Sequence, residues 1–480
     1  MSTFSTLEIG KRALQSNNFG LDVTSNNIAN VNTKGYSRRQ AVQSEADPFK
    51  RYGFAVGTGV DMESLRSFRQ EYLDREIRKA NARFSAYEVD VLLFNSIEVV
   101  MKEPTDSNIG ESINRFLYAF DELSLQPEVL GLRENLLSMS QTLVERFNKA
   151  SNEFLEMRRQ ANTDIVNAVD EANKLINLIA EYNKAIAISK DPSRNDALTF
   201  IDKREVAIEA LSHLGNVSVS YESNGLANVF INGINVVTGP SKHNLMVVEN
   251  NNEATGESTL TVMMHDERRD FYININPASG KLAASLRHYN VELNPELSTG
   301  GFSVVQTLNT YVRTFAEAVN SFFAVGYGLN DVDGAPAGRV LFESNSGDPI
   351  TAGNIKLSMT MEDAADIPFS ATPNTPGNGD IALQISRIMQ DGQFLEGQNP
   401  MEFYSNFIGR VSQNANEATN GKKATQLVVE HLNSTRDSVM GVNMDEEAIS
   451  LIKFQKNLEA ASRIIATTNQ VLSTIINLGL

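Results

Sequence analysis

Apolar residues recur every three or four positions from residue 132 to residue 186, and this pattern predicts one long helix. Neither glycine nor proline interrupts the run. The steps average about 3.6 residues, so roughly 55 residues would form a straight rod of about 80 Å. Similar patterns predict helices at 72–101, 109–123 and 305–322, and Asn399-Pro400 predicts an N-cap before a helix over 401–439. We therefore expect an elongated helical bundle.

The hydrophobic period changes to two near residue 217. Apolar and polar residues alternate there, and Asn224-Gly225 and Asn232-Gly233 are strong signals for hairpin turns. The pattern predicts a β domain over 215–283, to which strands from 330–379 are expected to be added. A cluster of prolines and glycines at 368–379 then marks a linker back to helix.

Each end of the chain carries a narrow apolar stripe. At the N-terminal end apolar residues recur at every seventh position, at Leu7, Leu14, Leu21 and Ile28. The companion row is mostly polar, so the pattern is half of a coiled-coil seam. The C-terminal stripe has two heptad rows, which are Leu451, Leu458, Ile465 and Leu472 and, three residues further on, Phe454, Ala461, Thr468 and Ile475.

Neither stripe is wide enough to stabilise a helix in water on its own. We therefore expect the two terminal helices to be partners of each other or of neighbouring molecules. We also expect them to be disordered in an isolated monomer, over about 1–32 and 445–480. Two ordinary surface helices remain the alternative.

These patterns together predict a mainly α, elongated, multi-domain chain with an inserted β domain and with its N- and C-termini together. The expected terminal assembly domain, with coiled-coil helices and an extended N-terminal arm, comprises 1–62 and 440–480. The expected long-helix bundle comprises 63–214, 284–329 and 380–439. The expected outer β-rich domain comprises 215–283 and 330–379.

Composition narrows the classes of function. The 480 residues carry 42 Lys and Arg against 59 Asp and Glu, a formal net charge of -17, which disfavours binding to nucleic acid or to an anionic membrane. There is no cysteine, so neither a disulfide framework nor a thiolate site is expected. The N-terminal segment lacks the apolar core of a cleaved signal peptide, and no later run is long enough to span a membrane.

Motifs for catalysis or metal binding are weak. The five histidines have no ligand spacing between them. The segment around Asp331 and Asp333 is similar to a calcium loop, but Leu329 and Val340 stand where its first and last carboxylates should be. Neither a nucleophile elbow nor a complete phosphate loop occurs in the sequence. We expect no catalytic, cofactor or metal site.

The segment 26–40, NNIANVNTKGYSRRQ, holds four asparagines within seven positions directly before Gly35-Tyr36. Asparagine tolerates left-handed backbone, and its amide can satisfy backbone groups that a helix terminus leaves unpaired. We expect the amides to end the first helix and to stabilise a turn, and we expect Gly35 to permit the reversal of the chain. The same amides are expected to be available to neighbouring subunits. The candidate assembly and turn motif is Asn26, Asn27, Ile28, Asn30, Asn32, Gly35 and Tyr36.

This segment resembles the N-terminal signature of the bacterial flagellar rod, hook and hook-associated proteins, the axial family of the flagellum. The segment at 441–480, which begins GVNMDEEAISLIKFQKNLEAA, resembles the closing helix of the same family. Within this family, the chain is most similar to the hook-associated members. The similarity rests on the order of three segments, GYSRRQ, FRQEYLDREIRKAN and NDALTFIDKREVAIEALSHLGNVSVS. The likeness covers nearly the whole chain and is weakest over 330–380, where an outer domain of longer relatives is expected to be missing.

The resemblance implies a structural role without catalysis, as a mechanical adaptor at the junction between hook and filament that motility requires. It implies terminal helices that line an inner tube, self-association into an annulus, and contacts with the hook protein and with the second junction protein, hook-associated protein 3. It also implies export through the flagellar type III apparatus to the extracellular flagellum, after capture of the C-terminal helix by an export chaperone.

Two alternatives remain. One is another axial member, such as the hook protein or a distal rod protein, which the long straight helix disfavours because those relatives are expected to be richer in β structure. The other is an extracellular adhesin or enzyme on a flagellar scaffold, which would need a pocket with converging polar groups in its outer β segment.

Overall fold

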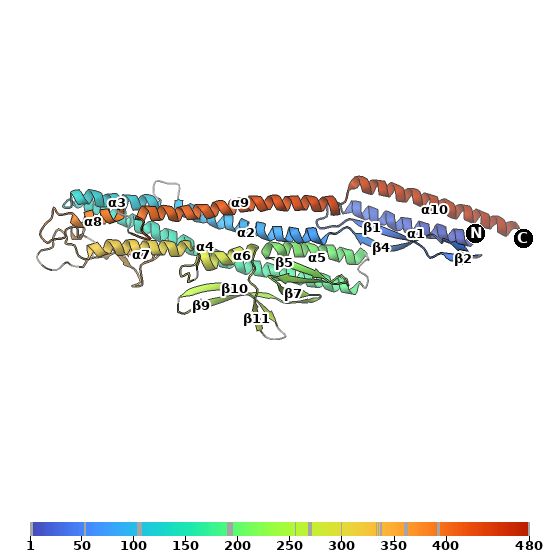
Figure 1. The fold of residues 1–480 in the computed structure, drawn as a ribbon, viewed down its shortest axis with the longest axis horizontal. Helices are drawn as coiled ribbons and strands as arrows, with labels where there is room; N and C mark the ends of the chain where they lie inside the picture. The colour runs from blue at the N-terminus through green and yellow to red at the C-terminus, as the bar shows by residue number, and fades with distance from the viewer. Residues whose placement is uncertain are drawn as a thin grey trace.

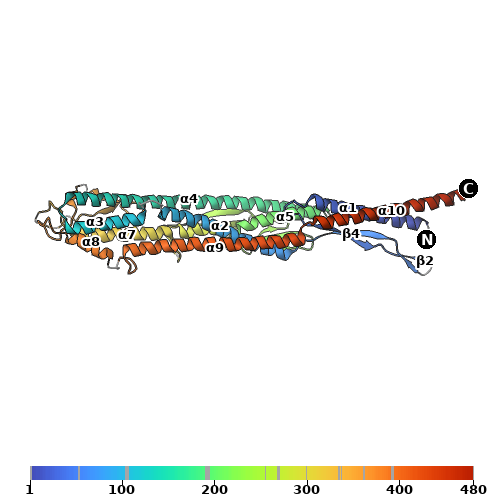
Figure 2. The ribbon, with the colours of Figure 1, turned by 90° about the horizontal axis from the view of Figure 1, so that it is seen from above.

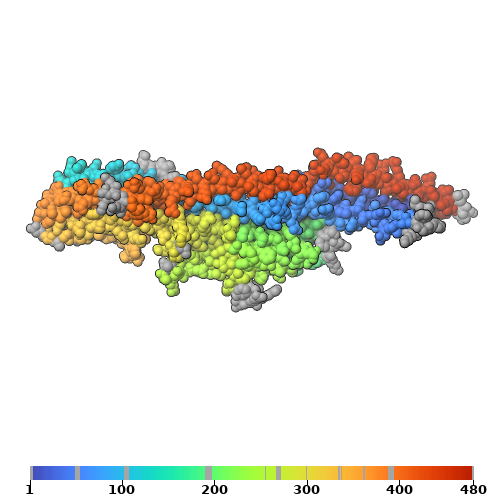
Figure 3. All heavy atoms as spheres, viewed as in Figure 1, coloured from blue at the N-terminus to red at the C-terminus, as the bar shows by residue number. Residues whose placement is uncertain are grey.

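The protein is a long rod with both chain termini at one end (Figure 1). This computed structural model describes residues 3–51, 54–102, 108–189, 195–254, 256–266, 271–298, 300–332, 334, 336, 338–359, 363–390 and 394–478. The chain runs to the far end of the rod and back twice, out through α2 and α7 and back through α4 and α9. A β-rich part stands out from the middle of the rod on one side (Figure 3).

The helices predicted from periodicity are present with nearly the predicted bounds. The longest, α4 (Leu130–Ile188), has 59 residues. Packed against it are α2 (Glu71–Lys102), α3 (Ile109–Leu125) and α7 (Val304–Phe323). α9 (Pro400–Met440) packs mainly on α2, and α8 (Asp380–Gln390) packs mainly on α3. At the predicted start of α9, Asn399 forms a capping box with Glu402.

Aromatic rings fill the core of this bundle. Phe116 of α3 packs against Phe315 of α7 with ring centroids 5.3 Å apart, and Phe147 of α4 packs against Tyr311 of α7 at 6.2 Å. Tyr311 also meets Phe403 of α9 at 5.9 Å. Such pairs contribute about 0.5–1.5 kcal/mol each beyond the burial of their area. Because they join helices from distant parts of the sequence, they hold the far half of the rod as one unit.

The β-rich part consists of two antiparallel sheets that pack on α4, α5 (Asn195–Leu214) and α6 (Lys281–Arg287), the last followed by the short helix η1 (His288–Glu292). One sheet has the order β5-β6-β7-β8, with strands Val217–Tyr221, Ala227–Ile231, Ile234–Thr238 and Ser241–Lys242. The other has the order β11-β10-β9, with strands Phe271–Asn274, Glu257–Asp266 and Leu245–Asn252.

The hairpin turn predicted at Asn232-Gly233 joins β6 to β7. Its two residues have φ of 49° and 79°. These positive values are those that a two-residue turn of type I′ requires, which is why asparagine and glycine occupy it.

The strands of 330–379 do not join these sheets, so that part of the expected outer β-rich domain is wrong. β12 (Phe342–Ser344) and β13 (Ile355–Leu357) pair with each other in a separate two-stranded sheet. Phe342, Ile355 and Phe369, the last beyond the 3-10 helix η3 (Ala364–Asp366), are buried in the aromatic core of the bundle. Alternation predicts a strand but not which of two apolar cores will receive it.

At the other end of the rod, α1 (Thr3–Ala29) and α10 (Met444–Leu478) form an antiparallel pair (Figure 2). Glycines on α1 permit the close approach. A Cβ at Gly10 would lie 2.9 Å from Cγ1 of Ile465, and one at Gly20 would lie 2.4 Å from the ring of Phe454. The two chain ends are therefore partners within one chain, one of the two expected arrangements.

The seam differs from the prediction on the α1 side. The most buried residues there are small or polar, namely Gly10, Ser16, Asn17, Gly20, Thr24 and Asn27, whereas Leu7, Leu14 and Leu21 are half-buried. On α10 the predicted rows are buried or half-buried except Ile475, which is 54% exposed. In the structure of the single chain both ends are helices that pack on each other, and hydrogen exchange on the purified monomer is the measurement that tests the expected disorder. Small residues on α1 take the place of a second apolar row.

A short β arm covers another side of α1. β1 (Arg39–Glu45) pairs antiparallel with β4 (Val60–Ser67), and β2 (Phe49–Arg51) pairs with β3 (Phe54–Val56). Arg12 of α1 forms an ion pair with Asp61 of β4 at 2.8 Å. The first helix is thus held between this arm and α10.

Gly20→Leu is expected to separate α10 from α1, because the new side chain would occupy the place of the Phe454 ring. Overpacking of this kind costs about 1–3 kcal/mol. Hydrogen exchange should become faster across 447–465 and stay unchanged in α4. Asn18→Leu, on the exposed side of the same helix, is the matched control, and equal exchange in the two variants would contradict the observed packing.

Candidate functional site: the joint between the terminal helices and the bundle

The asparagine-rich segment lies where the terminal pair meets the bundle, and Asn27 is at its centre. This residue is 1% exposed. Its Nδ2 donates to the carbonyl of Arg39 (2.8 Å) and to Oε2 of Glu447 (3.1 Å). Its Oδ1 accepts from the hydroxyl of Tyr36 (2.7 Å) and from the backbone N–H of Arg39 (3.1 Å). One fully bonded buried amide therefore joins α1, the loop after it and the first turn of α10.

Asn30 and Gly35 shape the loop itself. Nδ2 of Asn30 donates to the carbonyl of Asn26 (2.9 Å) and to its Oδ1 (2.7 Å), which closes the last turn of α1. Gly35 has φ of +78°, and a Cβ there would lie 2.1 Å from Cγ2 of Val206 in α5. Only glycine fits both conditions. None of the four asparagines has a positive φ, and Asn26, Asn27 and Asn30 act through side-chain hydrogen bonds.

The other residues of the predicted motif differ in role. Asn32 is exposed and Ile28 is half-buried. The ring of Tyr36 lies 5.0 Å from the guanidinium of Arg39. Burial raises the pKa of Tyr36 to about 12, so the hydroxyl stays protonated and remains a donor to Asn27.

Arg38 and Arg39 follow this loop and reach different partners. Arg38 pairs with two carboxylates at the start of α10, through Nη1 to Oε2 of Glu446 and through Nε to Oε1 of Glu447, both at 2.7 Å. Arg39 pairs with Oδ2 of Asp202 in α5 at 2.9 Å. Neighbouring residues of an extended chain point to opposite sides. Two adjacent arginines therefore connect the terminal pair and the bundle at one point.

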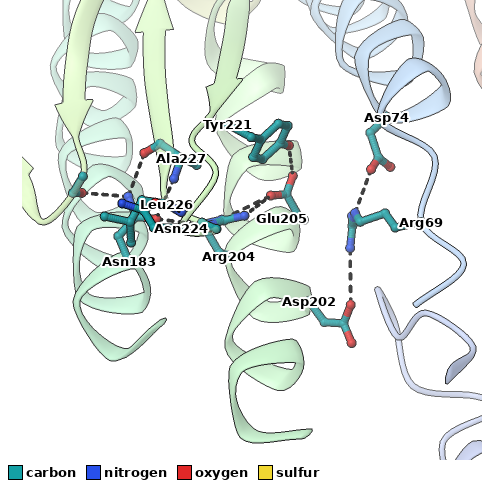
Figure 4. A network of polar contacts seen from close by, with 12 residues as sticks. Arg69, Asp74, Asn183, Asp202, Arg204, Glu205, Tyr221, Asn224, Leu226 and Ala227 are labelled. Carbon is teal, nitrogen blue, oxygen red and sulfur yellow. Dashed lines mark hydrogen bonds and ion pairs between the residues drawn. The ribbon is translucent and has the colours of Figure 1, made fainter. Parts of the chain in front are cut away.

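Arg69 extends the network into the bundle (Figure 4). Its guanidinium bridges Asp202 at 3.4 Å and Asp74 of α2 at 2.7 Å. One turn further along α5, Glu205 pairs with Arg204 at 3.0 Å. Removing one partner from a buried ion pair costs about 3–5 kcal/mol, because the other charge is left uncompensated. The orientation of α2, α5 and the loop is therefore defined by directional charge pairs.

A second buried amide attaches the β part to the helices. Asn183 of α4 donates to the carbonyls of Ala227 (2.8 Å) and Gly239 (2.7 Å). Its Oδ1 accepts from the backbone N–H of Ala227 and from Nη1 of Arg204, both at 3.1 Å. Figure 4 shows this amide between the strands and Arg204. The charged network therefore reaches from the joint to the β sheet.

Sequence reasoning found the asparagines but not their charged partners. In the sequence, Asp445, Glu446 and Glu447 are typical of the N-terminus of a helix, where negative charge is favourable, and name no partner. The adjacent arginines 38 and 39 were a possible signal, since they need carboxylates somewhere. Arg38 and Glu446 are 408 residues apart, however, and no spacing rule assigns a pair at that distance.

The sites considered for metal binding have other partners. Asp331 of the calcium-like segment pairs with Arg339 through both oxygens and accepts the backbone N–H of Gly328 at 2.7 Å. Among the described residues no three His, Asp or Glu side chains gather as metal ligands. In that same part of the chain, no helix combines the length and apolar character needed to cross a membrane.

Comparisons with known proteins match both sides of the joint. Residues 7–36 match the family described as flagella basal body rod protein. Residues 436–478 match the family described as flagellar basal body rod FlgEFG protein C-terminal. The terminal pair and its joint thus define an axial protein of the bacterial flagellum. Residues 94–342, more than half of the chain, match the flagellar hook-associated protein FlgK helical domain, and the chain belongs to this family.

Relatives and a solved structure agree with this assignment. Flagellar hook-associated protein 1 of Bacillus subtilis (strain 168) is 23% identical over 99% of this chain and 98% of the relative. That of Escherichia coli (strain K12) is 22% identical over 95% and 96%. The flagellar hook junction protein FlgK from Burkholderia pseudomallei shares the fold with a TM-score of 0.61 at 13% identity, over 76% of this chain and 100% of that chain. This chain is an axial structural component of the flagellum.

Asn27→Asp is expected to weaken the joint, because a carboxylate there would face Glu447 and lose the donor to the Arg39 carbonyl. We expect the free energy of unfolding to fall by about 2–4 kcal/mol in denaturant titrations. Asn32→Asp makes the same change at an exposed position of the same loop and should alter it by less than about 0.5 kcal/mol. Equal losses in the two variants would show that the buried amide does not hold the joint.

Stability is also expected to depend on pH through Glu205. Burial raises the pKa of this carboxyl, but Arg69, Arg204, Tyr221 and Arg78 outweigh burial and leave the pKa below its ordinary value of 4.5. A carboxyl with a lowered folded-state pKa stabilises the fold fully above its unfolded pKa and loses that contribution as the pH falls through the folded value. The free energy of unfolding should therefore decrease as the pH drops below about 4.5.

Glu205→Gln should be less stable than the wild type at pH 7 and should lose less stability between pH 7 and pH 3. Glu171→Gln, at an exposed position of α4, is the control and should follow the wild-type pH profile. Parallel profiles for wild type and Glu205→Gln would show that the guanidinium groups do not stabilise this carboxylate.

Proposed function

We propose that copies of this chain form an annular junction between the hook and the filament of the bacterial flagellum. The observation that carries the proposal is a second apolar stripe on α10, on residues that α1 leaves uncovered. Its exposed members are Ile449, Ile452, Ile464 and Val471. A row of exposed apolar side chains on a long helix is typical of a surface that another protein covers.

Neighbouring copies are the expected occupants of this stripe in the assembled annulus. The hook protein and hook-associated protein 3 would then contact the two faces of the annulus. Before assembly, the same stripe offers an export chaperone a binding surface on the C-terminal helix. The absence of cysteine is compatible with an unfolded passage through the flagellar type III apparatus to the extracellular flagellum, because no disulfide can form on the way.

The proposed role is mechanical and involves no catalysis. The alternatives of a hook protein or a distal rod protein are less well supported, since the rod-type matches are confined to 7–36 and 436–478 while the hook-associated match spans 94–342. The relative from Burkholderia pseudomallei is itself described as a hook junction protein, which favours the same role here.

Two pairs of substitutions test the two stripes of α10 independently. Each pair is expressed in a strain that lacks the gene for this protein. Leu458→Asp with Ile465→Asp puts charges into the seam with α1, and Ile464→Asp with Val471→Asp puts them into the outer stripe. We expect both to abolish filament attachment, seen by electron microscopy as hooks without filaments. Only the seam variant should also lose hydrogen-exchange protection in α10, and the aromatic core should melt as in the wild type in both.

The control is Gln455→Asp with Gln470→Asp, which adds two charges at exposed polar positions of α10 and should preserve filaments. Normal filaments in the outer-stripe variant would rule out an assembly role for that stripe. Full-length filaments on cells of the deletion strain that carry only the empty vector would count against the junction role itself.

A further inference from the structure

Asparagine followed by glycine is a sequence prone to spontaneous deamidation, because glycine lets the next backbone nitrogen approach the side-chain amide. The reaction requires that the N–H of the glycine be unbonded and that the asparagine side chain be able to turn towards it. The chain has four such pairs, which are Asn224-Gly225, Asn232-Gly233, Asn378-Gly379 and Asn420-Gly421. The fold decides which of them can react.

Two of the pairs are protected by backbone hydrogen bonds. Gly421 lies inside α9, where its N–H belongs to the bonded helix. The N–H of Gly225 donates to the carbonyl of Glu222 at 2.9 Å. Oδ1 of Asn224 also accepts the N–H of Leu226 at 3.0 Å. At both positions the attacking nitrogen is already bonded.

The pair at Asn378 is protected by packing. Its Oδ1 accepts the N–H of Asp380 at 3.0 Å. A Cβ on Gly379 would lie 2.7 Å from the carbonyl oxygen of Ser124. The backbone there is pressed against α3, so it cannot rearrange freely around the side chain.

Asn232 and Gly233 have neither kind of protection. Both residues are exposed in the turn between β6 and β7. No described residue accepts the N–H of Gly233, and beyond its chain neighbours none lies within 4 Å of an ideal Cβ placed on it. Oδ1 of Asn232 faces Nδ2 of Asn216 at 3.5 Å, which is long for a hydrogen bond. The amide carbonyl is therefore loosely held beside an unbonded backbone nitrogen.

The side chain of Asn232 also connects the two sheets of the β-rich part. Its Nδ2 donates to the carbonyl of Asn276, which follows β11, at 2.9 Å. Oδ1 of Asn276 accepts the backbone N–H of Val262 in β10 at 2.7 Å. Because Asn232 directly follows β6, this amide joins the sheet of β5 to β8 to the sheet of β9 to β11.

We propose that Asn232 is a site of spontaneous deamidation and that the reaction breaks this bond between the two sheets. The nitrogen of Gly233 gives its proton to hydroxide and bonds to Cγ of Asn232. The bond from Cγ to Nδ2 breaks, and Nδ2 leaves as ammonia with a proton from water. Water then opens the succinimide ring to aspartate or to isoaspartate. Overall one water is consumed and one ammonia is released.

The products cannot replace the lost contact. Neither has a donor for the carbonyl of Asn276, and both add a negative charge beside it. Isoaspartate also adds a methylene group to the main chain, which a two-residue turn of type I′ does not accommodate. The reaction needs no enzyme and no partner, so it is independent of the proposed junction role and accumulates with the age of the protein.

The first test compares two of the pairs within one tryptic peptide, which spans residues 205–242. The purified full chain is incubated at mildly alkaline pH, and fragment ions locate the mass gain that results when an amide becomes a carboxyl. We expect Asn232 to be modified about tenfold faster than Asn224, a factor that breaking one hydrogen bond can supply. A sample frozen at the start is the control for modification during digestion.

Unfolded protein provides the comparison that isolates the fold. In urea both turns are lost, so the rates at Asn232 and Asn224 should become similar. Equal rates in the folded protein, or faster modification of Asn224, would overturn the assignment of Asn232 as the reactive site.

The second test measures the consequence for the sheets. Asn232→Asp reproduces one product, and we expect hydrogen exchange to become about tenfold faster in β6, β7 and 274–278 and to stay unchanged in α9. Asn251→Asp adds the same charge at an exposed position of β9 and should leave exchange in these segments unchanged. Wild-type exchange in Asn232→Asp would show that the amide does not connect the sheets.

Discussion

The amide of Asn27 holds together two segments of the chain that are 420 residues apart, and the placement of the terminal helices on the bundle depends on this contact. Glycine-to-ring packing between α1 and α10 aligns the two helices but does not fix their direction relative to the bundle. The amide does, because it bonds at once to α1's following loop and to Glu447. Arg38 and Arg39 then pull α10 and α5 to the same point.

Two kinds of interaction hold different parts of the molecule together. The far half of the rod is held by interlocking aromatic rings, whose attraction depends mainly on shape and area. The joint is held by charge pairs and amides, whose strength depends on direction and is lost when one partner is removed. The bundle is therefore held by packing, while the joint defines the angle at which the bundle stands on its terminal helices.

The molecule also leaves an apolar surface exposed. The outer stripe of α10 consists of apolar side chains that the single chain leaves exposed. In the proposed annulus, neighbouring copies would cover this stripe.

Sequence by itself determined the helices, the hairpin at Asn232-Gly233 and the N-cap at Asn399, and it left two arrangements open for the chain ends. These follow from local periodicity and turn chemistry, which need no distant partner. Only the tertiary structure decided that Phe342 and Ile355 join the aromatic core rather than the outer sheets, that small residues of α1 form its seam, and that Asn27 selects Glu447. The physical reason is that apolar faces are interchangeable in sequence, while a buried hydrogen bond or ion pair is specified by atoms that come together only when distant segments fold.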